Sequence, residues 1–209
     1  DYAREARLAL DRGTNARVDL GVESAPPEAV RGALMRGRIV VAPDPDMLER
    51  SFDAAKYGEL PERLPLEAVS PTLLAGSEGR HLVSVTLQYA PATLKGAHWS
   101  DHRDDLVARA IAALEPHWPR LGKAVVEATA TTPQDIAAAT GSPGGHWHQL
   151  ELGLHQSFML RPVPGWAQYR APIAGLYLCG AGTHPGGGLS GRPGANGARQ
   201  ALADLKGQR

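Results

Sequence analysis

Glycine is distributed very unevenly along this chain. Fourteen of its 24 glycines fall between Gly141 and Gly197, within the last third of the 209 residues. Glycine adopts positive φ angles and lets a backbone approach another backbone or a ligand closely, but it weakens regular helices and strands. The sequence therefore predicts two differently built regions: a first part with ordinary periodic helices and strands, and a last part rich in turns.

The first part alternates between helical and extended patterns. Residues 81–89 (HLVSVTLQY) alternate with period two, which is typical of a half-buried strand, and residues 17–22 do the same. Asp44-Pro45 and Thr132-Pro133 are helix-start signals, because proline suits the first helical turn. Shorter strands are predicted at 38–42 and 125–128, and helices at 1–12, 45–57, 104–117 and 133–140. These elements predict an α/β to α+β fold with a mixed sheet.

Charge and cysteine content exclude several classes of protein. The chain has 22 basic and 22 acidic residues, which argues against a nucleic-acid-binding protein, since such proteins bind phosphates through cationic side chains. The single cysteine, Cys179, excludes an internal disulfide. The longest uncharged stretch, between Arg170 and Arg192, contains too many glycines and prolines for a membrane-spanning helix. We predict a cytoplasmic protein, either free or peripheral to a membrane.

The most informative segment lies near the C-terminus. Residues 173–179 (IAGLYLC) form a short apolar run typical of a strand buried on both faces, with Cys179 as a small buried residue. A glycine-rich turn follows at 180–188 (GAGTHPGGG), and apolar residues recur at helical spacing from 189 to 205. Strand, turn and helix in this order are typical of a phosphate or cofactor site. The alternative is a glycine-rich connection that packs the last helix tightly against a sheet.

Other motifs in this region are incomplete. Gly180-Ala181-Gly182 matches the beginning of the dinucleotide fingerprint G-x-G-x-x-G, but Pro185 stands where the third glycine belongs. Residues 188–192 (GLSGR) approximate a hydrolase nucleophile elbow, with arginine in place of its last glycine. Four histidines occur in the last third, but no cysteine or carboxylate pattern accompanies them, so we predict no metal site. These histidines are His146, His148, His155 and His184.

Two longer segments carry a family resemblance. Residues 160–170 (LRPVPGWAQYR) and 172–188 (PIAGLYLCGAGTHPGGG) resemble the C-terminal signature of the phytoene dehydrogenase-like FAD-dependent oxidoreductases. Tyr57, residues 88–91 (QYAP) and residues 132–136 (TPQDI) resemble the same family in the same order. The resemblance therefore covers nearly the whole chain, and its last third is specific.

The resemblance implies a fold and a cofactor. Residues 1–145 are expected to form part of a substrate domain, and residues 146–209 the C-terminal strand, turn and helix of a Rossmann-like FAD-binding domain. Gly180, Ala181 and Gly182 would then approach the ribityl and phosphate groups of FAD, although relatives often carry an acidic residue at the position of Ala181. The rest of the implied cofactor site comprises Thr183, His184, Gly186, Gly187, Gly188, Leu189 and Ser190, the last four at the N1/O2 edge of the flavin. His146, His148, His155 and Gln156 are expected to line the substrate pocket that faces it.

The resemblance also implies partners. No N-terminal FAD-binding segment with G-x-G-x-x-G precedes Asp1, so we expect a missing N-terminal half or a partner chain to supply it. The isolated chain should then bind FAD weakly or not at all, and an exposed sheet edge should favour self-association. The expected reaction is oxidation or desaturation of a hydrophobic small molecule, with no catalytic residue assigned. The alternative is a non-catalytic interaction subunit whose glycine-rich turn is structural.

Overall fold

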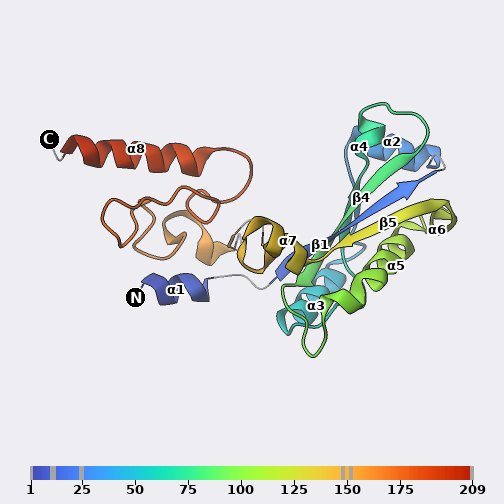
Figure 1. Cartoon of the computed structure of the whole chain (residues 1–209), viewed down its shortest axis with the longest axis horizontal. Coiled ribbons are helices and arrows are strands. Elements are labelled where there is room, and N and C mark those ends of the chain that lie inside the picture. Colours follow the sequence, from blue (N-terminus) through green and yellow to red (C-terminus); the bar gives the residue numbers. More distant parts are fainter. Residues whose placement is uncertain (1, 10–12, 24–25, 147–148, 151–152, 208–209) are drawn as a thin grey trace. The chain divides into compact units, whose positions relative to one another are not determined.

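The chain forms two compact units in a computed structural model that describes residues 2–9, 13–23, 26–146, 149–150 and 153–207 (Figure 1). Residues 12–145 make up the first unit, which we call the sheet unit. Residues 1–11 and 146–209 make up the second, which we call the glycine-rich unit. The composition change near residue 141 thus falls close to a unit boundary, while the N-terminal segment groups with the C-terminal one.

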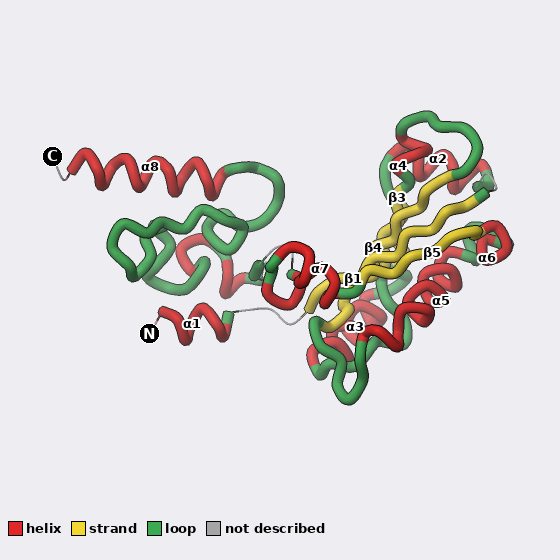
Figure 2. Tube along the Cα trace, viewed as in Figure 1, coloured by secondary structure: helices red, strands yellow, loops and turns green. Residues whose placement is uncertain are grey.

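The sheet unit is built on five strands in the order β2-β3-β4-β1-β5 (Figure 2). All four pairings are antiparallel, so the prediction of a mixed sheet is wrong. The strand sequences explain this result, because apolar and polar residues alternate along them. Such alternation is typical of an antiparallel sheet with one covered face, whereas parallel strands are usually apolar on both faces. The strands are β1 (Gly13–Val22), β2 (Ile39–Val41), β3 (Leu66–Val69), β4 (His81–Pro91) and β5 (Val125–Thr131).

The core of this unit lies where β1 and β4 pair at the centre of the sheet. Val18 faces Val85 and Leu20 faces Val83 across the ladder, and all four side chains are buried. The helix α5 (Arg103–Leu114) contacts β5 and β1 and buries Leu106 against the same cluster. Cross-strand pairs of branched aliphatic residues are the basic unit of sheet stability, and here they fix the register.

Helix starts in the sheet unit follow the sequence signals. Asp44 caps α3 (Pro45–Lys56) by accepting a hydrogen bond of 2.6 Å from the backbone N–H of Met47. Thr132 and Asp135 form a capping box at α7 (Pro133–Thr140), and Gly141 ends that helix with φ of +72°. Four elements were not predicted: α2 (Glu28–Arg36), β3, α4 (Pro71–Leu74) and α6 (Leu121–Ala124). Short 3₁₀ turns complete this unit at η1 (Trp99–His102) and η2 (Pro143–Gly145).

The glycine-rich unit has helices but, among its described residues, no strand. It contains α1 (Tyr2–Leu8), η3 (Leu154–Gln156), η4 (Phe158–Leu160) and α8 (Arg192–Gly207), with one isolated bridge between Arg170 and Tyr177. The predicted buried strand at 173–179 is wrong: Ile173 is 67% exposed and Leu176 is 46% exposed. Within this unit the run has no neighbouring strand, and its backbone bonds locally instead, as from Leu178 N–H to the carbonyl of Tyr169. Cys179 is exposed, which corrects its predicted burial.

The helices of the described residues differ from membrane-spanning helices in length and hydropathy. None of them combines the length and the apolar character needed to cross a bilayer. The longest, α8, has 16 residues and carries charged side chains throughout.

Candidate functional site

The first part of the glycine-rich turn borders a pocket. Gly180, Ala181, Gly182 and Thr183 line a cavity of about 410 Å³, which we call the glycine-turn pocket. Its other walls are Tyr2, Ala6, Gln149, Leu150, Pro162, Leu178 and Cys179, all from the glycine-rich unit. None of these lining side chains is charged. The turn is therefore accessible from outside the protein and adjoins a largely apolar space.

Thr183 closes the turn. Its backbone N–H donates to the carbonyl oxygen of Gly180 at 3.0 Å, and its hydroxyl donates to the same oxygen at 2.9 Å. The side chain is only 4% exposed. These two bonds hold residues 180–183 in a tight loop, because both end on one acceptor.

Arg161 fixes the turn from behind. Its guanidinium is 1% exposed and donates through Nε and Nη2 to the carbonyl oxygen of Ala181, at 3.1 and 2.8 Å. Nη2 also donates to the carbonyl of Leu150 at 3.4 Å. Burial lowers the pKa of Arg161 from its ordinary value, and the carbonyl oxygens compensate the buried charge in part. The sequence prediction missed this residue, although it lies in the family-like segment 160–170.

These contacts leave a particular set of backbone groups available. The carbonyls of Gly180 and Ala181 are occupied, whereas the N–H groups of Ala181 and Gly182 have no acceptor among the described residues. Free N–H groups in a tight glycine-rich loop are the donors that phosphate and other oxyanions use. The N–H groups of Ala181 and Gly182 are therefore two backbone donors without an acceptor among the described residues.

The glycines of this region serve two different purposes. At Gly197, in α8, a Cβ atom would lie 2.9 Å from the carbonyl oxygen of Leu178 and 3.3 Å from the Cβ of Cys179, so glycine permits close helix packing. At Gly180 and Gly188 an added Cβ would meet nothing within 4 Å. Gly188 has a φ of +90°, which favours glycine, but space is not its constraint. The packing interpretation thus holds for Gly197, whereas the cofactor interpretation of Gly180 and Gly188 stays a prediction.

The second part of the turn is exposed. Gly188, Leu189 and Ser190 are all open to solvent, and Leu189 has no part of its side chain covered. The backbone N–H of Arg192 donates to Ser190 Oγ at 3.3 Å just as α8 begins. The helix N-terminus with its partial positive charge therefore follows directly on the exposed glycines.

The predicted pocket histidines are dispersed. His146 is buried and His155 is exposed, whereas His148 lies outside the described residues. Neither of the two that are described lines the glycine-turn pocket, and Gln156 does not line it either. Gln149 and Leu150, from the same segment, do line the pocket and were not singled out from the sequence. The substrate-pocket role of the four predicted residues stays a prediction.

His184, in contrast, is held within the turn. Its carbonyl oxygen accepts a hydrogen bond of 3.0 Å from the Tyr169 hydroxyl, which in turn accepts one of 2.7 Å from Asn196 of α8. Its ring stacks near Phe158, with centroids 6.5 Å apart. The buried Nδ1 atom has no hydrogen-bond partner in the described structure. Across the described residues, no group of three or more His, Cys, Asp or Glu side chains is placed to hold a metal ion.

Asp204 ties α8 to the segment before the turn. Its carboxylate receives Nε and Nη2 of Arg170 at 2.8 and 2.7 Å, the Tyr177 hydroxyl at 2.9 Å and the Gln200 amide at 2.9 Å. The Arg170 and Tyr177 bonds hold the pKa of Asp204 well below its usual range. The hydrogen bond to Asp204 raises the pKa of Tyr177. This network anchors the C-terminal half of α8.

Comparisons with known proteins place this geometry in context. No family model matches the chain. It is 37% identical over 168 residues to pyridine nucleotide-disulfide oxidoreductase domain-containing protein 2 of Rattus norvegicus, and 36% identical to that of Mus musculus. Each match covers 77% of this chain and 28% of the relative. The chain thus spans little more than a quarter of the length of these relatives.

A second group of relatives matches a shorter part of the chain. The phytoene desaturase (neurosporene-forming) of Cereibacter sphaeroides is 33% identical over 92 residues, which is 44% of this chain and 16% of that protein. The enzyme of the same name from Rhodobacter capsulatus is 32% identical over 95 residues, 45% of this chain and 17% of that protein. These matches confirm the resemblance seen in the sequence: the chain is related to pyridine nucleotide-disulfide oxidoreductase domain-containing protein 2 and, over a shorter stretch, to the phytoene desaturases.

Proposed function

We propose that this chain is the C-terminal portion of an FAD-dependent oxidoreductase, in which the turn at 180–190 lies against the cofactor. One observation carries the proposal: the carbonyls of Gly180 and Ala181 accept hydrogen bonds from Thr183 and Arg161, while the N–H groups of Ala181 and Gly182 have no acceptor among the described residues and Gly180 borders open space. The names of the related proteins support the reaction class, oxidation and desaturation.

The residues present fit such a cofactor. The N–H groups of Ala181 and Gly182 are available to the ribityl and phosphate oxygens, and the open space at Gly180 lets a ligand lie against the backbone. The start of α8 after Ser190 favours a negatively charged ligand edge beside Gly187, Gly188 and Leu189. When bound, the flavin supplies the acceptor for the hydride that leaves the substrate. The chain's own groups orient it and exclude water.

We propose a hydrophobic substrate. The glycine-turn pocket has no charged lining, and the related desaturases are named for phytoene, a hydrocarbon. His146, His148, His155 and Gln156 are proposed to face this substrate, although the described ones among them do not line the glycine-turn pocket, and the buried Oε1 of Gln156 has no hydrogen-bond partner in the described structure.

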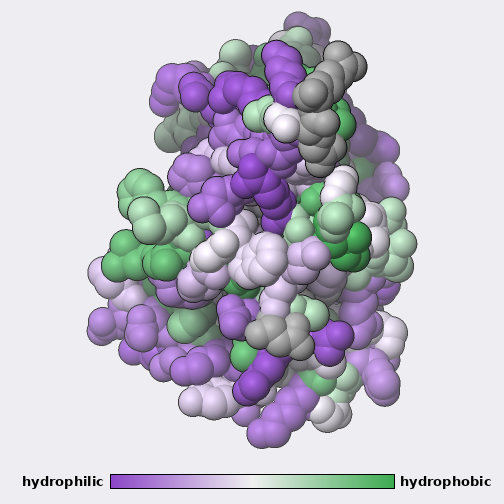
Figure 3. Space-filling model, turned by 90° about the vertical axis from the view of Figure 1, so that its left-hand side faces the viewer, coloured by the Kyte–Doolittle hydropathy of each residue, from purple (hydrophilic) through white to green (hydrophobic). Residues whose placement is uncertain are grey.

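The partner in this proposal is the remaining FAD-binding part of the oxidoreductase. Several apolar side chains of the glycine-rich unit are exposed. Apolar patches are visible on the face of the molecule that Figure 3 draws. Ile173 and Leu176 belong to the run that lacks a strand neighbour, and Leu202 and Leu205 lie on α8. A partner sheet would pair with the run and cover these side chains.

A hybrid protein tests the proposal directly. The segment of the rat relative that matches this chain is replaced by residues 1–209, and the purified hybrid is examined for visible flavin absorbance and its bleaching by a reductant. Stoichiometric, reducible flavin supports the proposal. A well-folded hybrid without flavin contradicts it and favours the non-catalytic interaction subunit, for which the exposed Leu154, Phe158 and Met159 would be the contact residues.

A further inference from the structure

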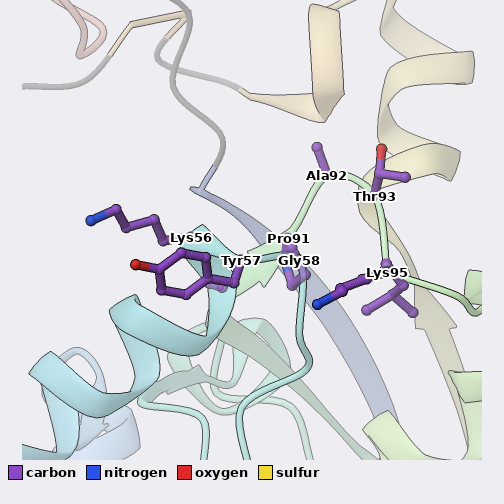
Figure 4. Close-up of a pocket in the computed structure, with 9 residues that line it drawn as sticks. Lys56, Tyr57, Gly58, Pro91, Ala92, Thr93 and Lys95 are labelled. Atoms are coloured by element: carbon purple, nitrogen blue, oxygen red, sulfur yellow. The ribbon is translucent and has the colours of Figure 1, made fainter.

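A second pocket lies in the sheet unit, which contains none of the residues assigned to the cofactor. It occupies about 500 Å³ between the end of α3 and the loop that follows β4 (Figure 4). Its walls are residues 55–58 and 91–95, all within the sheet unit. We call it the lysine pocket, because Lys56 and Lys95 are its only charged lining residues.

The two walls of the lysine pocket are fixed to each other. The backbone N–H of Lys95 donates to the carbonyl oxygen of Gly58 at 2.8 Å. Gly58 has a φ of +76°, and a Cβ there would lie 3.1 Å from the carbonyl oxygen of Thr93. A direct backbone bond and a contact this close define a preformed cavity, which lowers the entropic cost of binding.

The charged and hydroxyl groups of the pocket have no ion-pair or hydrogen-bond partner among the described residues. Neither the Lys56 nor the Lys95 ammonium forms an ion pair or a hydrogen bond with any described residue, and the Tyr57 hydroxyl forms none. The Lys56 ammonium lies 5.6 Å from the centre of the Tyr57 ring, and that ring is 65% exposed. Figure 4 shows Lys95 extending from the opposite wall toward Gly58 and Tyr57. Lys56 extends beside the Tyr57 ring and away from Lys95, so the pocket is lined by two separate cations and an aromatic ring, without a carboxylate.

Other pockets lack this combination. The glycine-turn pocket has no charged lining, and in the pocket beside α8 Arg170 is neutralised by Asp204. The pocket at Trp118 and Lys123 includes the carboxylate of Glu23. That pocket also holds two cations, Arg120 and Lys123, so what distinguishes the lysine pocket among these four is a lining with cations, an exposed aromatic ring and no carboxylate.

We infer that the lysine pocket binds a phosphorylated ligand with a planar ring, of the size of a mononucleotide. A lysine ammonium binds phosphate as a point charge, whereas planar bidentate recognition of a carboxylate favours arginine. The exposed ring of Tyr57 offers a stacking face to a base. A volume of about 500 Å³ lies within the usual range for small-ligand pockets. This inference does not depend on the proposed flavin site.

Adenosine 5′-monophosphate is the probe, with adenosine and inorganic phosphate as its two halves. Titration of the full chain, followed by amide chemical shifts, should move Gly58, Ala92, Thr93 and Lys95, and the nucleotide should bind more tightly than either half. Lys95→Ala should weaken nucleotide and phosphate binding about tenfold, the size of a charge-assisted hydrogen bond. Tyr57→Leu should weaken nucleotide and adenosine binding about fivefold, as expected for lost stacking, and leave phosphate unchanged.

Lys123→Ala is the matched control, since Lys123 is an exposed lysine of the same unit outside this pocket. It should leave all three affinities unchanged. Equal effects of Lys95→Ala and Lys123→Ala would overturn the inference, because they would show non-specific attraction by surface charge. Shifts confined to residues 180–188, or no binding of the nucleotide at millimolar concentration, would overturn it as well.

Discussion

The two units of this protein are stabilised by different kinds of buried side chain. The sheet unit buries a contiguous cluster of aliphatic side chains, with Val18, Leu20, Val85 and Leu87 fully covered. Among the described residues of the glycine-rich unit, the buried hydrophobic side chains are Leu150 and Val163, and its buried polar ones include Arg161, Gln156 and Thr183. The difference teaches that one unit rests on apolar burial, while the other rests on particular hydrogen bonds and close glycine contacts.

The largest effect is expected in the sheet core. Leu87→Ala removes a fully buried side chain from β4 and should lower the free energy of unfolding by about 3 kcal/mol, through lost transfer energy and a residual cavity. Leu205→Ala is the control in the other unit, because Leu205 is 59% exposed, and it should change stability little. Urea unfolding measures both. Equal effects of the two substitutions would abolish the contrast between the units.

Arg161 is the counterpart of such a core residue in the glycine-rich unit. Arg161→Met should destabilise this unit by about 2 kcal/mol, because it removes charged hydrogen bonds and leaves the carbonyls of Ala181 and Leu150 buried without a donor. Amide hydrogen exchange at Thr183 should accelerate, while exchange in β4 stays unchanged. Arg161→Lys should recover less than half of the loss, since an ammonium cannot reproduce the planar fork. Full recovery with lysine would show that charge alone suffices.

Close packing at Gly197 gives a third test. Gly197→Ala places a Cβ 2.9 Å from the carbonyl oxygen of Leu178, and the forced shift should cost about 1–2 kcal/mol despite the better helix propensity of alanine. Gly207→Ala is the control, because a Cβ at Gly207 in the same helix meets nothing within 4 Å. Protection of the α8 amides reports the outcome. A stabilised Gly197→Ala protein would mean that α8 does not pack as described.

The smallest effect concerns two carboxylates, one in each unit. Arg103 and Thr132 hold the pKa of Asp135 well below its usual range at the start of α7, as Arg170 and Tyr177 do for Asp204 in α8. A depressed folded-state pKa stabilises the protein above the unfolded value of about 3.9, and this stabilisation is lost as the pH falls through the folded value. Both helices should therefore lose amide protection below about pH 4.

Asparagine substitutions separate these two carboxylates. Asp204→Asn should remove the acid sensitivity of α8 and leave that of α7, and Asp135→Asn should do the converse. The pH dependence of amide exchange in each helix is the measurement. Loss of both sensitivities in a single variant would show that the two units do not respond independently.

The sequence allowed the sheet unit to be predicted far better than the glycine-rich unit. Alternation at 81–89 gave β4 correctly, and Thr132-Pro133 gave the start of α7, because these signals are local. β3 was missed because its four residues are too few for a period to be detected. Local patterns were therefore sufficient for β4 and α7, but not for α2, which buries Val30 and Leu34, or for the short β3.

In the glycine-rich unit the decisive contacts are not local. The run 173–179 has the composition of a buried strand. A strand also needs a neighbouring strand to pair with, and the composition of the run does not show whether one is present. Arg161 and Ala181 are 20 residues apart, and their residue types do not predict the hydrogen bonds between them. Gly180 lies in the predicted turn and Gly197 in the predicted helix, but the sequence does not show that one borders open space and the other contacts Leu178 and Cys179.

The central claim is that the open glycines of the turn lie against a flavin, and a matched pair of substitutions in the hybrid oxidoreductase tests it. A Cβ meets nothing within 4 Å at either Gly180 or Gly207, so neither Gly180→Val nor Gly207→Val should disturb the chain itself. The account predicts that Gly180→Val lowers the flavin content of the purified hybrid at least tenfold, while Gly207→Val leaves it unchanged. Full flavin content in both variants would contradict the claim.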